Sequence, residues 1–322
     1  MNLKRSFHPV ILGTALFAVA SSAFASPFVL TNGTGDGTVT LGVDGYGAFG
    51  SSVGSDSSNA VYDPIGAIGA AGTTYESGIA FGTGAARTFL TSGDIGSSGS
   101  LTNPTVTGSS TSAQSSFTYG GLDFSLTQSL VTLTSGSRLD QVYTVTNPGA
   151  SSASFELVRY IDGDLYFDGS LIDGGGRLFL GGGTEVLFET DSATGASTST
   201  TFVGITGEGG TIPATGRYEV AGYSGLRSRI INGTALADTV VGDGGDLDQF
   251  IDAGAGYDVT LALRNTFSLA PGATTTYSTS TIFGSGAPAA GGDGGTVPEP
   301  SVLALLGLGL VGMAFARRRH KG

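Results

Sequence analysis

Residues 257–272 read YDVTLALRNTFSLAPG, and this stretch decides the fold class. Large apolar side chains fall on alternate residues, whereas an α-helix would repeat them every 3.6 residues. The turn pair Pro271-Gly272 then ends the pattern. We therefore predict a β-strand with one face in a core. The apolar residues of this strand are Tyr257, Val259, Leu261, Leu263, Phe267 and Leu269.

The same period-two alternation recurs through the middle of the chain, in segments rich in Thr, Val, Tyr and Phe. No segment between residues 26 and 286 sustains a helical period, so we expect no helix there. The Ser/Gly/Thr-rich stretch 92–116 is expected to be a long loop. We predict an all-β body, a large antiparallel two-sheet β-sandwich that is supersandwich-like in size. Its expected strands lie near residues 38–49, 73–91, 122–130, 143–145, 155–161, 177–190, 199–206, 217–231, 257–269 and 277–283.

The N-terminal 25 residues have the three parts of a signal peptide. Lys4 and Arg5 form a basic region, residues 10–20 are apolar, and Ala23 and Ala25 supply a small-x-small cleavage site. The apolar run falls short of the roughly 18 residues that a membrane span needs. We predict that signal peptidase removes residues 1–25 and that the body comprises residues 26–286.

The C-terminal end is built in a fixed order. A Gly/Ala-rich linker, residues 287–296, leads to the sequence VPEP at 297–300, an uncharged apolar segment at 301–316 and a basic cluster. Sixteen helical residues span roughly 24 Å, which arginine snorkelling can extend across a bilayer. Because basic residues stay cytoplasmic, the body would lie outside the membrane. The cluster comprises Arg317, Arg318, Arg319, His320 and Lys321.

This order of parts, with Pro298, Glu299 and Pro300 ahead of the apolar segment, resembles the PEP-CTERM sorting signal of Gram-negative bacteria. The resemblance covers residues 297–322. It implies recognition by an exosortase-type membrane protease, removal of the tail after transient inner-membrane anchoring, and release to the outer surface or the extracellular matrix. Such proteins commonly accompany exopolysaccharide and biofilm. A plain C-terminal anchor would give the same topology.

Missing residue types restrict the chemistry of the body. Both histidines, both lysines and both methionines lie in the two ends, and the chain has no Cys or Trp. Residues 26–286 therefore cannot form a Ser-His-Asp or Cys-His pair, a lysine Schiff base or a zinc site with His or Cys ligands. Carboxylate chemistry such as glycoside hydrolysis remains open, but no spacing pairs the acids. The glutamates concerned are Glu76, Glu156, Glu185, Glu189, Glu208 and Glu219.

The body is strongly acidic. Of the 14 basic residues six lie in the two ends, and of the 26 acidic residues only Glu299 lies in the tail. Counting Asp293 of the linker with the body, eight arginines therefore face 25 acids, a net charge of about −17, and we expect repulsion from nucleic acid.

Two clusters of acids alternate with glycine, a pattern that suits Ca²⁺, which binds six to eight oxygens. The stronger candidate comprises Asp243, Asp246, Asp248 and Asp252, and the weaker one Asp162, Asp164 and Asp168. Asp and Gly also favour turns without any ion, so both interpretations stay open.

Together these features predict a non-enzymatic, exported structural protein of the cell surface or extracellular matrix, associated with exopolysaccharide. Two alternatives remain: a non-catalytic carbohydrate-binding protein and a glycoside-acting enzyme that uses two carboxylates.

Overall fold

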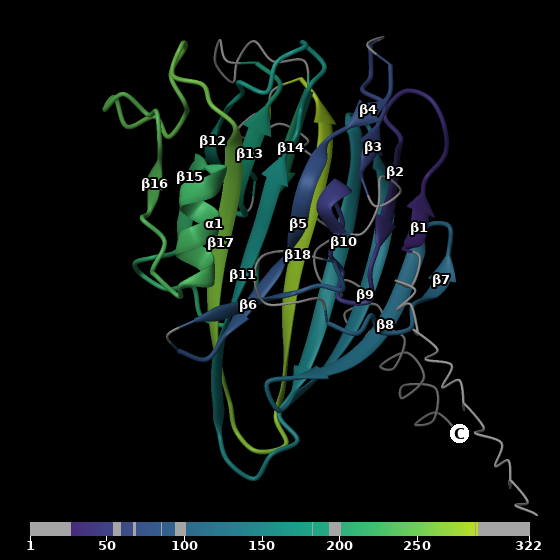
Figure 1. Cartoon of the computed structure of the whole chain (residues 1–322), viewed down its shortest axis with the longest axis vertical. Helices are drawn as coiled ribbons and strands as arrows, with labels where there is room; N and C mark the ends of the chain where they lie inside the picture. The colour runs from purple at the N-terminus through teal and green to yellow at the C-terminus, as the bar shows by residue number, and fades with distance from the viewer. Residues whose placement is uncertain are drawn as a thin grey trace, which may run out of the picture.

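The computed structural model describes residues 27–53, 59–66, 69–84, 86–93, 101–181, 183–192, 201–286 and 288. The predicted signal peptide, the tail and all of the linker except Pro288 lie outside these residues. Within them the chain is mostly β, which confirms the predicted class. Figure 1 shows long strands running side by side through the height of the molecule.

Two large sheets form the body. The first contains eight strands in the order β12-β13-β14-β18-β10-β9-β8-β7 and is antiparallel throughout. Its strands are β7 (Thr107–Ser109), β8 (Ser112–Tyr119), β9 (Leu122–Leu133), β10 (Gly136–Thr146), β12 (Gly174–Phe179), β13 (Glu185–Thr190), β14 (Thr201–Ile205) and β18 (Thr274–Ser285).

The second sheet contains six strands in the order β16-β15-β17-β11-β5-β6, antiparallel except for the parallel pair β15 and β16. Its strands are β5 (Thr74–Gly82), β6 (Arg87–Leu90), β11 (Ala153–Gly163), β15 (Tyr218–Gly222), β16 (Thr239–Val240) and β17 (Val259–Leu269). The 92–116 loop prediction is wrong in its second half, because β7 and the start of β8 lie there.

The core lies between the two large sheets, and the period-two pattern determines which side chains enter it. In β9, Leu122, Phe124 and Leu126 are buried, while Asp123 and Ser125 between them are exposed. These side chains meet a row of aromatic residues from the six-stranded sheet. Within that row, Phe155 stacks on Phe267 with ring centroids 4.9 Å apart.

One helix covers the outer face of the six-stranded sheet, which corrects both the expectation of no helix and the strand expected over 217–231. That segment divides into β15 and α1 (Tyr223–Ile231). Leu226 and Ile230, one turn apart, pack on Val158 and Ala262 of the sheet. Figure 1 shows α1 against β15 and β17. The helix is short and contains Gly225, so its sequence carries little helical periodicity.

A third, four-stranded sheet departs from the two-sheet prediction. It comprises β1 (Phe28–Thr31), β2 (Val39–Val43), β3 (Val61–Tyr62) and β4 (Ala71–Gly72), and a 3₁₀ turn, η1 (Ser51–Val53), follows β2. Leu30, Leu41 and Tyr62 of this sheet are fully buried in the core that the large sheets share. The Tyr62 hydroxyl lies 3.0 Å from Ser285 Oγ, at the end of β18.

The edge strand β12 is covered by the loop that follows β16. The Arg177 N–H donates to the Gln249 carbonyl, and the Ile251 N–H donates to the Gly175 carbonyl. A covered edge cannot pair with another chain. The same contacts place the acidic loop, residues 243–252, next to β12.

A buried arginine links the two large sheets. Arg159 of β11 is 1% exposed and has no carboxylate partner among the described residues. Its guanidinium donates to Ser77 Oγ on β5 and to Thr281 Oγ1 on β18, each at 2.8 Å. Burial lowers the pKa of Arg159 to about 10. The Arg159 guanidinium is thus hydrogen-bonded to both sheets at once.

Candidate functional site

The sorting residues predicted at both ends, from Ala23 and Ala25 to Arg317, Arg318 and Arg319, lie outside the described residues. Within the described chain, α1 and η1 are too short and too polar to cross a membrane. The candidate sites that can be examined are therefore the acid clusters and the grooves of the body.

The 243–252 loop brings three of its four predicted acids together. Carboxylate oxygens of Asp243, Asp246 and Asp248 lie within 4.8 Å of one another, close enough to share a cation. Asp252 is not part of this group; its Oδ2 accepts a hydrogen bond from the Gly244 N–H at 3.0 Å. Calcium binding by this loop remains a prediction, with three direct ligands rather than four.

The second predicted cluster begins at the end of β11. Asp162 is 3% exposed, whereas in the loop that follows Asp164 is half-buried and Asp168 is exposed. Burial and the neighbouring charge of Asp258 raise the pKa of Asp162 to about 8 and that of Asp164 to about 6. Asp168 accepts a hydrogen bond from the Ser170 N–H at 2.9 Å, which is the turn role expected without an ion.

Two acids from other elements join this cluster: Glu189, which the sequence analysis named only as an unpaired glutamate, and Asp173, which it did not name. Asp173 precedes β12, and Glu189 lies near the end of β13; the antiparallel pair β12–β13 brings them together. Burial is the main cause that raises the pKa of Asp173 to about 8 and that of Glu189 far above its usual value. Asp191, whose pKa rises to about 6 for the same reason, lies next to Asp168. We call Asp162, Asp173 and Glu189 the buried acid cluster.

Besides Glu185, which is described below, three of the candidate glutamates form ion pairs with arginines. Glu156 Oε1 lies 2.5 Å from Arg87 Nε, and its Oε2 lies 2.6 Å from Arg264 Nε. Burial alone would raise the pKa of Glu156, but the two guanidiniums outweigh it and lower the pKa. Glu76 pairs with Arg227, and Glu219 with Arg229. With its pKa lowered in this way, Glu156 is a poor general acid, since it does not carry a proton at neutral pH.

The remaining two, Glu185 and Glu208, line one groove, a cavity of about 520 Å³ between β12, β13 and the chain that leads into β15. Phe179 is 50% exposed at its rim and Ile212 is 61% exposed. Arg177 is sandwiched between aromatic rings, 4.8 Å from the Phe179 centroid and 3.9 Å from that of Tyr218. We call this cavity the Phe179 groove. It combines an exposed ring with charged and polar groups.

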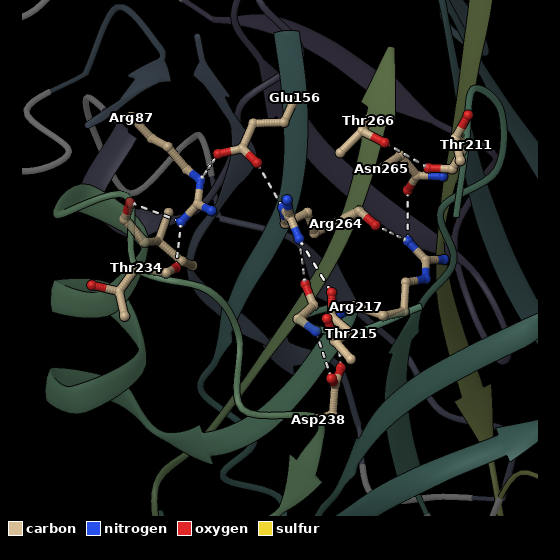
Figure 2. A network of polar contacts seen from close by, with 12 residues as sticks. Arg87, Glu156, Thr211, Thr215, Arg217, Thr234, Asp238, Arg264, Asn265 and Thr266 are labelled. Carbon is tan, nitrogen blue, oxygen red and sulfur yellow. Dashed lines mark hydrogen bonds and ion pairs between the residues drawn. The ribbon is translucent and has the colours of Figure 1, made fainter. Parts of the chain in front are cut away.

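The floor of the Phe179 groove is held rigidly. Arg217 donates to Glu185 Oε2 at 2.8 Å and to Asn265 Oδ1 at 2.7 Å. Its backbone N–H donates to Asp238 Oδ1, and its Nη1 also donates to the Arg264 carbonyl. Figure 2 shows this network continuing through Arg264 to Glu156 and Arg87. The network therefore connects the groove to β6, β11 and β17 and leaves its floor little freedom to move.

Comparison with known proteins bears first on the C-terminal end. Residues 296–319 match the PEP-CTERM protein-sorting motif. The chain carries a PEP-CTERM sorting motif. No curated protein is similar to the chain in sequence.

Solved structures give weak likenesses to the body. A polysaccharide lyase is 12% identical with a TM-score of 0.34, over 66% of this chain and 26% of the lyase, so the chain spans about a quarter of that protein. A galactose mutarotase-like protein from Lactobacillus casei is 8% identical with a TM-score of 0.34, over 80% of this chain and 100% of the other. Scores this low support no inference about fold or activity.

The PEP-CTERM motif establishes that this is an exported protein, sorted to the cell envelope or surface and processed by exosortase-type machinery. It accounts for the Pro298-Glu299-Pro300 sequence and the basic end. It does not determine what the β-body does once exported.

Proposed function

We propose that this protein is a structural component of the cell surface or extracellular matrix that associates with exopolysaccharide without cleaving it. The observation that carries the proposal is the Phe179 groove on an exported body. An exposed aromatic ring offers a flat apolar face to a sugar ring, and the surrounding Arg177, Glu185 and Glu208 offer hydrogen bonds to hydroxyl groups.

Two features of the groove favour binding over turnover. Glu185 accepts hydrogen bonds from both Arg177 and Arg217, at 2.7 and 2.8 Å, so both of its oxygens are already engaged. Glu208 accepts a hydrogen bond from Thr184 Oγ1 at 3.1 Å. Hydrolysis by two carboxyl groups requires one of them to be protonated. At Glu185 each oxygen accepts from a guanidinium group, so neither is free to contact a glycosidic oxygen.

A rigid body suits a protein that remains outside the cell. Without disulfides, its stability depends on core burial and on paired polar groups. The two long sheets bury a large area between them. The ion pairs on the six-stranded sheet supply the paired polar groups.

The test is a pull-down of the exported protein with polysaccharide from its own host. We expect retention on the polysaccharide, binding about tenfold weaker for Phe179→Ala, and no release of reducing ends. Tyr75→Ala is the matched control, since Tyr75 is a similarly exposed ring, at 45%, on β5. Absence of retention would refute the association with exopolysaccharide.

Two alternatives make different predictions. A dedicated carbohydrate-binding protein would select one glycan on an array with micromolar affinity, whereas a matrix component would bind its host polymer broadly and weakly. A glycoside-acting enzyme would release reducing ends and lose that activity in Glu208→Gln. Glu185 and Glu208, lining one groove, are the observation that keeps the enzyme in consideration.

A further inference from the structure

The buried acid cluster contains carboxylates that have no ordinary reason to be buried. Glu189 is fully buried, no regular hydrogen bond of the described residues reaches either of its oxygens, and its near polar neighbours are the Asp173 carboxyl group and the Leu165 N–H. Asp173 is 1% exposed, and its Oδ1 lacks a partner in the same part of the chain. The two carboxyl groups lie within reach of each other, and Asp162 adds charge nearby. Burying an unpaired carboxylate costs several kcal/mol, so this arrangement needs a counter-charge.

The described residues supply no such charge. The body has neither lysine nor histidine, and no ion pair of the described chain involves Asp162, Asp173 or Glu189. Arg227 is the guanidinium that acts on Asp162, but its Nε lies 2.8 Å from Glu76. The positive charge of Arg227 is therefore already paired with Glu76.

The backbone makes room for the Glu189 carboxylate. A Cβ atom on Gly163 would overlap Glu189 Oε2, so any larger residue there would displace this carboxylate. The register of β11 against β5 shifts between Asp162 and Gly163. Such a bulge turns a strand's side chains and carbonyls out of their regular directions, and bulges are frequent next to functional sites.

We propose that Glu189 and Asp173 bind one calcium ion in the interior of the body, with Asp162 adding negative charge around it. The ligands are oxygens alone, which selects a hard cation, and millimolar calcium is the condition under which extracellular modules bind this ion. This site is separate from the exposed loop of Asp243, Asp246 and Asp248, and it does not depend on polysaccharide binding.

The competing explanation is a single proton shared between the two carboxyl groups, which would also relieve their repulsion. The two explanations differ in whether stability depends on calcium in the solution. A shared proton needs no ion and is insensitive to a chelator, whereas a calcium site loses stability when calcium is removed.

The experiment is native mass spectrometry of the exported protein at pH 7.5 in 2 mM calcium, together with melting curves in calcium and in EDTA. The exposed loop is first disabled by Asp246→Asn and Asp248→Asn. We expect one calcium to remain bound in that variant and a melting midpoint at least 5 °C higher in calcium than in EDTA. Magnesium in place of calcium should give a smaller rise.

Adding Glu189→Gln should remove the remaining ion and the calcium-dependent rise, and Asp173→Asn serves if that variant does not fold. Glu208→Gln, a glutamate in the Phe179 groove, is the matched control and should keep the ion. Gly163→Ala should weaken calcium binding at least tenfold. A loop variant that holds no ion, or a Glu189→Gln variant that keeps one, overturns the proposal. The proposal is also overturned if Glu189→Gln raises the melting midpoint of the loop variant by the same amount in calcium and in EDTA. That result would identify the shared proton.

Discussion

Replacing Glu156 by Gln tests the ion pairs that connect α1 and the Phe179 groove to the six-stranded sheet. The carboxylate bridges two arginines, with Arg87 Nε at 2.5 Å and Arg264 Nε at 2.6 Å. The Arg87 side chain is 1% exposed, and its Nη1 also donates to the Thr234 carbonyl beyond the end of α1. Glutamine keeps one acceptor but turns an amide N–H₂ toward the other arginine, leaving a buried charge without its counterion.

The magnitude follows from the burial of the three groups. Removing one partner of a fully buried pair costs about 3–5 kcal/mol. Glu156 and Arg264 are 13% and 19% exposed, so water recovers part of this, and we expect a loss of roughly 2–3 kcal/mol. For a body of this size, 1 kcal/mol corresponds to about 2–4 °C, so the melting midpoint should fall by roughly 5–10 °C at pH 7.

The stability difference between the wild type and Glu156→Gln should depend on pH in a definite direction. The folded-state pKa of Glu156 is lowered, so its stabilising contribution is present above the unfolded value of about 4.3 and is lost as pH falls through the folded value. Thermal melts followed by circular dichroism at pH 7 and pH 3.5 should therefore show a smaller difference between the wild type and Glu156→Gln at the lower pH. Asp123→Asn, on the exposed face of β9, is the control and should shift the midpoint by less than 2 °C. A Glu156→Gln shift as small as the control's at pH 7 would refute the reasoning, as would a difference that grows in acid.

Three further predictions concern other parts of the chain. Arg159→Lys should lower the free energy of unfolding by about 2–3 kcal/mol, because an ammonium cannot reach both Ser77 and Thr281 on opposite sheets; an unchanged urea midpoint would contradict this. If the 243–252 loop binds calcium, Asp246→Asn with Asp248→Asn should reduce the shift of the melting midpoint by EDTA, and the wild-type midpoint should depend on calcium. The mass of the protein released from cells should exclude Arg317 to Lys321; a product that retains them would show that the tail is not removed.

The all-β class followed from local sequence because a strand exposes its two faces alternately to core and solvent. Leu122, Phe124 and Leu126 are buried in β9 as their spacing predicts, and the same holds for Phe267 and Leu269 in β17. The first half of β17 is buried on both faces, because α1 covers the outer one, and no pattern within residues 259–263 reveals a covering element elsewhere in the chain.

By itself, the sequence determined the sorting signal, which is a contiguous string of residue types read in order, and the β class, which is a local periodicity. It also excluded histidine, lysine and cysteine chemistry from the body, since composition does not depend on folding. Only the tertiary structure decided which acids meet. Glu189 and Asp173 come from two antiparallel strands that place them at the same end of the pairing, and Arg87 reaches Glu156 across 69 residues of chain. Such contacts depend on strand register and sheet order, which arise from packing over the whole body rather than from any single segment.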